Sequence, residues 1–341
     1  MSLTRDDLDA AVDAGVLDAR ARDRLLLFLA QRTGDAPTPD AESFRLLTGF
    51  NDIFVALACI LLLVAVGSLA PAVVAPFAIA AASWGLAEYF TRQRRLALPS
   101  IILLLAFVGG VFAGVLLLFG AGQSLFVSAV GAQIAAPRGL AAAGAAAVAA
   151  AIAHWFRFRV PITMAAGAAG LVVLAGGLAA RLTGNSTVLL ITMFAAGVAV
   201  FAAAMAYDMR DRERITRNTD IAFWLHLLAA PLIVHPIFTL SGLMSSTPAP
   251  GAAVLVLLVY AKLTCVAVAI DRRALLVSAL VYVLWALNGL FAAGQVAAGF
   301  GLTALVLGSF LVILSAAWKN LRRHLLRFLP ARILRRLPPP D

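Results

Sequence analysis

The chain has 341 residues, of which 62% are hydrophobic and 13% charged, and its mean hydropathy is +0.97. A soluble globule of this size needs more polar surface than this composition provides, so we expect lipid to solvate much of the chain. The formal net charge of +10 does not indicate nucleic-acid binding, because the arginines lie in short clusters between apolar runs.

Residues 1–49 are expected to form a small cytoplasmic helical hairpin followed by a linker. Thr4 and Asp18 can cap two short helices, and Gly15 and Gly34 can end them. Two short helices bury little surface by themselves. We therefore expect this hairpin to pack on the membrane domain or on a protein partner.

Residues 50–318 are expected to form an all-α transmembrane bundle of about ten spans, because lipid leaves free backbone groups without hydrogen-bond partners. About 20 apolar residues cross a bilayer core of roughly 30 Å, and runs of that length recur along the chain. The expected spans lie near residues 51–70, 72–90, 98–119, 139–156, 161–180, 187–207, 221–243, 252–270, 274–291 and 300–318.

The positions of the cationic residues predict the orientation of these spans, because Lys and Arg concentrate in cytoplasmic loops. With the N-terminus inside, every second span returns the chain to the cytoplasm, and a cationic cluster follows each of them. These clusters are Arg92, Arg94 and Arg95; Arg157 and Arg159; Arg210, Arg212, Arg214 and Arg217; Arg272 and Arg273; and Lys319 to Arg336. The loops assigned to the other side carry Arg138 and Arg181. Both termini are therefore predicted to be cytoplasmic.

Two segments do not fit a simple pattern of span and loop. Residues 120–138 are too apolar for an ordinary loop, so an interfacial or re-entrant segment is expected there. Residues 319–341 are a basic tail with leucines among arginines, as in a helix that lies on anionic lipid. We favour a topology anchor for this tail over a regulatory or docking helix.

Two stretches of the sequence carry a resemblance. LDAAVDAGVLDARARDRLLLFLAQR, followed by FRLLTGFNDIFV and many spans, resembles uncharacterised bacterial polytopic membrane proteins with an N-terminal cytoplasmic domain of unknown function. The segment DIAFWLHLLAAPLIVHPIF is similar to a segment of such proteins. The resemblance implies a bacterial inner (plasma) membrane location and no established activity, and it assigns no functional residue.

Ionisable side chains inside lipid are costly, so each one indicates a candidate function. His226 and His235 lie in the seventh expected span, Lys262 in the eighth and Asn288 in the ninth, at overlapping depths. We predict that these four residues line a substrate-binding site between the helices. The alternative is that Lys262 snorkels or binds backbone carbonyls and that the histidines make local hydrogen bonds.

Pro231 and Pro236 lie within the seventh expected span. Each lacks a backbone N–H and clashes with the preceding turn, so we predict a kink or a break in this helix. Broken helices expose backbone groups to substrates or ions in many transporters.

Two polar positions are expected to be structural. Glu88, close to the end of the second span, is expected to form an interfacial salt bridge with the arginines that follow it rather than to couple protons. His154 is expected to lie at the interface, at the inner end of the fourth span.

No sequence motif indicates a metal, a cofactor or a catalytic group. The chain lacks a P-loop, an HExxH and a GxGxxG, and Cys59 and Cys265 lie far apart in apolar segments. We therefore expect no metal, no cofactor and no nucleic-acid partner, and an enzyme is less favoured than a non-enzyme.

Three functions from different classes remain. The first is a membrane scaffold, assembly or sensing protein whose hairpin and tail bind partners. The second is a secondary permease for a small solute, an anion being one option, with its site between spans seven to nine. The third is an intramembrane enzyme that uses His226 or His235 as a base.

Overall fold

The computed structural model describes residues 8, 11–32, 50–119, 139–211, 214, 216–240, 250–273, 275–276, 280, 283–284, 287, 299–330, 334 and 337. The chain divides into two compact units, one within residues 1–44 and one within residues 45–340, here called the membrane unit. The described residues lie in helices or in the turns between them, with no strand among them. The predicted all-α fold class is thereby confirmed.

The N-terminal unit contains helix α2 (Ala19–Arg32), which follows a short helical stretch at residues 11–13 and a turn. Gly15 in this turn has a φ of 69°, a left-handed conformation that glycine adopts without a steric penalty. The N–H groups of Val16 and Leu17 both donate to the carbonyl of Ala11. Most of the first helix of the predicted hairpin lies outside the described residues, so the hairpin stays a prediction.

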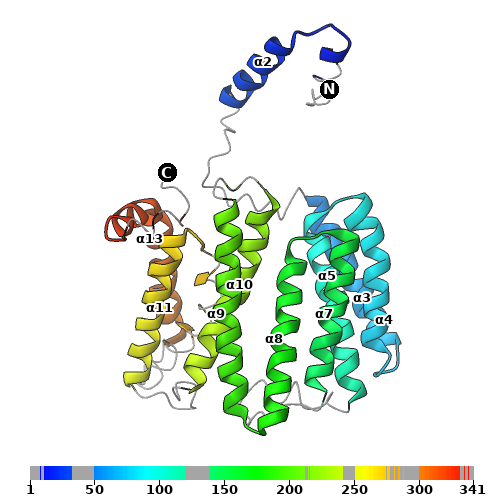
Figure 1. The fold of residues 1–341 in the computed structure, drawn as a ribbon, viewed down its shortest axis with the longest axis vertical. Coiled ribbons are helices and arrows are strands. Elements are labelled where there is room, and N and C mark those ends of the chain that lie inside the picture. Colours follow the sequence, from blue (N-terminus) through cyan, green and yellow to red (C-terminus); the bar gives the residue numbers. More distant parts are fainter. Residues whose placement is uncertain are drawn as a thin grey trace. The chain divides into compact units, whose positions relative to one another are not determined.

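The helices of the membrane unit run up and down in one bundle (Figure 1). Their bounds are α3 Phe50–Leu69, α4 Ala75–Ala87, the π-helix η1 Glu88–Gln93, α5 Ala97–Leu118, α7 Leu140–Phe158, α8 Ile162–Thr183, α9 Ser186–Arg210, α10 Arg217–Leu240, α11 Pro250–Ile270 and α13 Gly299–Leu326. Within the described part of the chain, 7 helices are long and apolar enough to cross a membrane: α3, α5, α7, α8, α9, α10 and α13.

The remaining predicted spans are shorter or incompletely described. The second corresponds to α4, which has 13 residues and passes directly into η1. The eighth corresponds to α11, whose apolar part is described as Leu257–Ile270. The ninth is described only at isolated helical positions between residues 275 and 287. The number of ten spans therefore stays a prediction, and residues 120–138 lie outside the described residues.

Most helices that are consecutive in the sequence, from α3 to α10, pack against one another, and small residues permit their closest approach. A Cβ atom on Gly110 of α5 would lie 2.5 Å from the backbone oxygen of Pro76 in α4. A Cβ atom on Gly144 of α7 would lie 2.5 Å from the backbone nitrogen of Leu174 in α8. Because lipid tails are as apolar as leucine, such close packing, rather than exclusion of water, holds membrane helices together.

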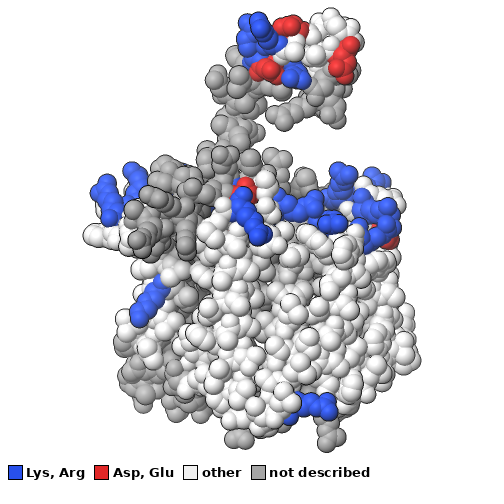
Figure 2. Space-filling view, in the orientation of Figure 1, with Lys and Arg blue, Asp and Glu red and all other residues white. Residues whose placement is uncertain are grey.

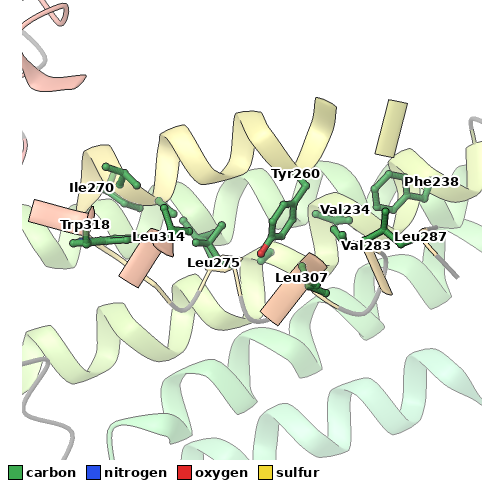
Figure 3. Close-up of a cluster of buried hydrophobic side chains, with 14 of the residues drawn as sticks. Val234, Phe238, Tyr260, Ile270, Leu275, Val283, Leu287, Leu307, Leu314 and Trp318 are labelled. Atoms are coloured by element: carbon green, nitrogen blue, oxygen red, sulfur yellow. The ribbon is translucent and has the colours of Figure 1, made fainter. Parts of the chain in front are cut away.

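A buried hydrophobic cluster joins the C-terminal helices (Figure 3). Its members include Val234 and Phe238 from α10, Tyr260 from α11, and Leu314 and Trp318 from α13. Side chains from the described positions between residues 275 and 287 complete it. This cluster fixes which face of α11 points inward.

Helix α10 continues from Arg217 to Leu240 with Pro231 and Pro236 inside it. The helix is therefore not interrupted at either proline, and whether it is kinked there, the other half of the expectation, stays a prediction. Each proline removes its own N–H donor and crowds the preceding turn, and packing can hold the helix together at such a position. Packing is extensive here, because 56% of the residues in the most apolar stretch of α10 are buried.

Helix α13 does not end where the last predicted span ends. It continues past Trp318 to Leu326, so the first part of the basic tail is an extension of this helix. Arg322 in this extension is buried, with 4% of its surface exposed. At least this arginine packs inside the protein rather than on lipid.

Charged side chains gather mostly along one rim of the membrane unit, and a broad band with few charges lies below this rim (Figure 2). A band of this kind is what the hydrocarbon core of a bilayer requires. Together with the long apolar helices, it is compatible with a multi-pass membrane protein.

Candidate functional site

Three buried side chains, one each from α9, from α10 and from the turn after α11, meet near the end of α9. The Nε2–H of His226 in α10 donates to Oδ2 of Asp208 in α9 over 2.9 Å. The Nε–H of Arg272, just after α11, donates to the same oxygen over 3.3 Å, and a second nitrogen of Arg272 donates to Oδ1. The exposed fractions are 3% for Asp208, 0% for His226 and 1% for Arg272, so water does not screen this triad.

The end of α11 aims Arg272 at Asp208. The N–H of Arg272 donates to the carbonyl of Ala267 and the N–H of Asp271 donates to that of Val268, which is the Schellman arrangement at a helix C-terminus. Asp271 takes the left-handed position of this motif with a φ of 57°. Glycine is usual there, whereas aspartate is tolerated because its short polar side chain bonds locally.

The carboxylate of Asp271 ties the end of α11 to two further elements. Its Oδ2 accepts from Arg214 at 2.8 Å and lies 3.8 Å from Arg322. Its Oδ1 accepts from the indole N–H of Trp318 at 2.7 Å. Arg214 also donates to the backbone oxygen of Asp271 at 3.1 Å. Asp271 therefore connects the segment between α9 and α10 with α11 and α13.

Asp211 organises the start of α10. Its Oδ2 accepts from the N–H of Thr216 at 2.9 Å and from the hydroxyls of Thr216 and Thr219 at 2.6 and 2.8 Å. These bonds satisfy donors that a helix N-terminus would otherwise leave free. We call the set formed by Asp208, Asp211, Arg214, His226, Asp271, Arg272 and Arg322 the ionic cluster.

The ionic cluster is close to electrical balance. Its three aspartates oppose its three arginines, so His226 can remain neutral. Burial lowers the pKa of Arg214 from its ordinary value, and the positive charge of Arg272 lowers it further, whereas Asp271 opposes the change. Desolvating so many charges is expensive, and the cost is recovered only with good geometry and satisfied hydrogen bonds.

The ring of His226 retains one free nitrogen. With Nε2–H donating to Asp208, the neutral ring leaves Nδ1 unprotonated, and this atom has no hydrogen-bond partner among the described residues. The ring of Phe201 lies against it at 5.2 Å between centroids. A buried imidazole bonded to a carboxylate can gain or lose a proton, which is the one chemical change this site offers.

The structure separates the residues that were predicted to form one site. His226 belongs to the ionic cluster, and His235 is half-buried about 14 Å further along α10, as nine residues at the helical rise require. Lys262 is exposed on the outer face of α11, where no hydrogen bond or ion pair joins it to another described residue. Asn288 lies outside the described residues. Whether a solute site forms around these positions stays a prediction.

Sequence reasoning missed Asp208 and interpreted Arg272 only as a marker of topology. Asp208 directly follows the sixth predicted span, where a carboxylate among arginines is typical of an ordinary loop. The available signal was the position of both residues at predicted cytoplasmic ends. Their pairing across 64 positions required the packing of α9, α10 and α11.

A second polar site joins η1 to α7. Glu88 accepts two hydrogen bonds from Arg157, at 2.6 and 2.7 Å, and lies 3.4 Å from Arg92. The salt bridge predicted for Glu88 therefore exists, although its main partner is Arg157 rather than the arginines that follow Glu88 directly in the chain. The pair links the ends of the second and fourth predicted spans.

His154 is buried, with 1% of its surface exposed, so its side chain packs inside the protein, while its predicted depth at the membrane interface stays a prediction. Its Nδ1 lies 3.1 Å from the hydroxyl of Thr163 in α8. The rings of Phe107 and Phe158 pack against it, with centroids 6.1 and 4.6 Å away. Side chains from neighbouring helices thus enclose the His154 ring.

Comparison with known proteins adds no assignment. No protein-family model matches the chain, and neither a curated protein nor a solved structure matches it. The functional interpretation therefore depends on the geometry of the chain itself.

Proposed function

We propose that the chain is a ten-span protein of the bacterial inner membrane, with both termini in the cytoplasm, and that it acts as a scaffold, assembly or sensing subunit. The observation that carries this proposal is the outward position of Lys262. The charge best suited to bind a solute inside the bundle lies on its outer surface, where it can meet a partner. His226, the other central candidate, is already bonded to Asp208, which also binds Arg272.

The ion pairs support the proposed topology. Asp208 and Arg272 lie at the ends of the sixth and eighth predicted spans, and Arg322 of the tail lies 3.8 Å from Asp271. Glu88 and Arg157 lie at the ends of the second and fourth. In each pair both members belong to segments predicted to be cytoplasmic, so these contacts agree with alternating spans.

The proposed partners lie on the cytoplasmic side and in the bilayer. The N-terminal unit is the candidate for a protein partner, and the basic tail beyond α13 is the candidate for anionic lipid. A subunit of this kind needs no cofactor and no solute path. Its buried charges would instead fix how the helices meet.

Purification from the native membrane tests the scaffold proposal. The tagged full chain is extracted in polymer-bounded lipid discs, and the same preparation is reconstituted for solute flux. We expect a partner protein to co-purify in fixed proportion to the chain, and deletion of residues 1–40 to weaken its binding. We expect no flux of small anions or cations above that of empty vesicles. A chain that purifies alone and carries solute would overturn the proposal.

A secondary permease is the second candidate, and the buried pair of His226 and Asp208 favours it. Intramembrane carboxylates and histidines commonly relay protons in pumps and transporters. In this case the ionic cluster would close one end of a solute path and would open when His226 gains a proton. Solute uptake driven by a pH gradient and abolished by Asp208→Asn would support this candidate. Uptake that is unchanged in Asp208→Asn would remove it.

A further inference from the structure

We propose that the outer face of α11 around Lys262 binds a transmembrane helix of another protein, and that this helix carries an Asp or Glu at the depth of Lys262. This inference rests on the proposed scaffold function and names the chemistry of the partner.

The face is defined by the exposed side chains of α11. Leu255, Leu258, Lys262, Cys265 and Val266 are exposed, and their spacing of three or four residues places them on one stripe of the helix. The opposite stripe is occupied, because Tyr260, Thr264, Ala267 and Val268 are buried in the bundle. Lys262 therefore lies in the middle of an apolar surface that no described helix of this chain covers.

The depth of Lys262 makes an unpaired charge costly. Helix α11 ends at Ile270, and Arg272 and Arg273 follow it at the predicted interface. Lys262 lies about 12 Å along the helix axis from the end of α11 at Ile270, well inside a bilayer core of roughly 30 Å. Lysine is among the least favourable residues at the centre of a span, even when its aliphatic chain extends the ammonium group towards the interface.

A carboxylate on a neighbouring helix relieves this cost best. It neutralises the ammonium and accepts its hydrogen bonds in a medium that screens charges weakly. Asn or Gln would accept a hydrogen bond but would leave the charge in lipid. The chemistry of the face therefore specifies an acidic residue with apolar residues around it.

A second copy of this chain does not meet that requirement. Two symmetric copies would place Lys262 against Lys262, which repel each other. Among the described parts of the spans and their ends, the carboxylates of Asp52 and Asp208 are buried at 2% and 3% exposure, and that of Asp220 is partly buried at the start of α10. The side chain of Glu88 is 30% exposed, but it lies at the end of its predicted span and is paired with Arg157. The part of the chain that the structure describes thus offers no exposed carboxylate at this depth, which favours a different protein.

A synthetic helix tests this directly. The purified full chain is reconstituted in phosphatidylcholine vesicles with a labelled polyleucine helix that carries one central Asp, and association is measured by energy transfer. The same peptide with Leu in place of the Asp is the reference. We expect the Asp peptide to bind roughly tenfold more tightly than the Leu peptide, the equivalent of one strong interhelical contact.

Variants of the chain make the result specific. Lys262→Met should abolish the preference for Asp, and Lys262→Glu should transfer it to a peptide with a central Lys. A Lys262→Met, Leu61→Lys chain carries its lysine on the exposed face of α3 and should not regain the preference. Equal binding of the Asp and Leu peptides would contradict the proposal, as would a preference that survives Lys262→Met or returns with Leu61→Lys.

Cross-linking in the native membrane distinguishes this inference from the proposed function. A photoreactive maleimide on Cys265 reaches the same face, and Cys265→Ser is the control. We expect an adduct with one protein that has a carboxylate within a span. The adduct should be lost in Lys262→Met and should return when Lys262→Glu is combined with a lysine in place of the partner's carboxylate. A partner that co-purifies equally with wild type and Lys262→Met would refute the inference and leave the scaffold function standing. Adducts with lipid alone, or with a second copy, would also refute the inference.

Discussion

Individual charges determine how the ends of α9, α10, α11 and α13 meet. Asp208 receives hydrogen bonds from two residues, and Asp271 receives them from the side chains of Arg214 and Trp318. A buried charge left without its partner costs far more than the pair contributes when intact. The ionic cluster should therefore respond strongly to single substitutions and weakly to paired ones.

Asp208→Asn tests this asymmetry. The amide keeps the shape of the carboxylate but leaves the guanidinium of Arg272 buried without its counter-charge, so we expect a loss of about 3–5 kcal/mol in unfolding free energy. Thermal and denaturant-induced unfolding of the purified protein in detergent measures this loss. The double variant Asp208→Asn, Arg272→Met should recover most of it, and Glu88→Gln at the surface pair should lose much less. Equal losses in Asp208→Asn and the double variant would show that the lost charge pairing is not the cause.

Asp271→Gly separates backbone strain from charge pairing at the end of α11. Glycine fits the left-handed φ of 57° better than aspartate, but it removes the acceptors of Arg214 and Trp318. Because the lost pairing outweighs the relieved strain, we expect Asp271→Gly to lower the melting temperature. Asparagine tolerates the left-handed backbone and can still accept from Trp318. The melting temperature of Asp271→Asn should therefore lie between those of wild type and Asp271→Gly. A glycine variant that is more stable than wild type would show that strain dominates.

Among the helices themselves, close contacts of small residues specify the packing. Gly110 of α5 faces the backbone of α4, whereas its neighbour Gly109 faces open space, with no atom within 4 Å of the position that a Cβ atom would take. The two glycines are adjacent in sequence and chemically identical. Only their angular position on the helix distinguishes them.

Gly110→Ala and Gly109→Ala form a matched pair of substitutions. We expect Gly110→Ala to weaken the packing of α5 on α4, because its methyl group would meet the Pro76 oxygen at 2.5 Å. Gly109→Ala should be neutral or stabilising by up to about 1 kcal/mol, since alanine favours helices. The fraction of monodisperse protein after detergent extraction and its melting temperature give the comparison. Equal behaviour of the two variants would contradict the assigned interface.

The sequence predicted the apolar helices well because hydrophobic length is a local property. It could not predict the outer position of Lys262, because α11 is apolar on its inward and outward faces alike and has no polar stripe to orient it. The pairing of Asp208 with Arg272 also needed tertiary packing. Pro231 and Pro236 predicted a kink or a break, and α10 continues across both positions.

For the molecule as a whole, the proposed topology requires alternating spans with both termini in the cytoplasm. A chain with Cys59 and Cys265 replaced by serine can carry one new cysteine at Gln93, predicted inside, or at Leu182, predicted outside. We expect a membrane-impermeant maleimide to label Leu182→Cys in intact spheroplasts and Gln93→Cys only after permeabilisation. Labelling of Gln93→Cys in intact spheroplasts would require a different number of spans or the opposite orientation.

The proposed scaffold function and its acidic partner helix are tested together by a cryo-electron microscopy structure of the tagged chain in lipid discs cut from its native membrane. We expect an additional helix against Leu258, Lys262 and Val266, with a carboxylate within hydrogen-bond distance of the lysine ammonium, and a bundle closed at the ionic cluster. Lipid alone on this face, together with a water-filled cavity that reaches His226 or His235, would contradict both proposals and would favour a permease.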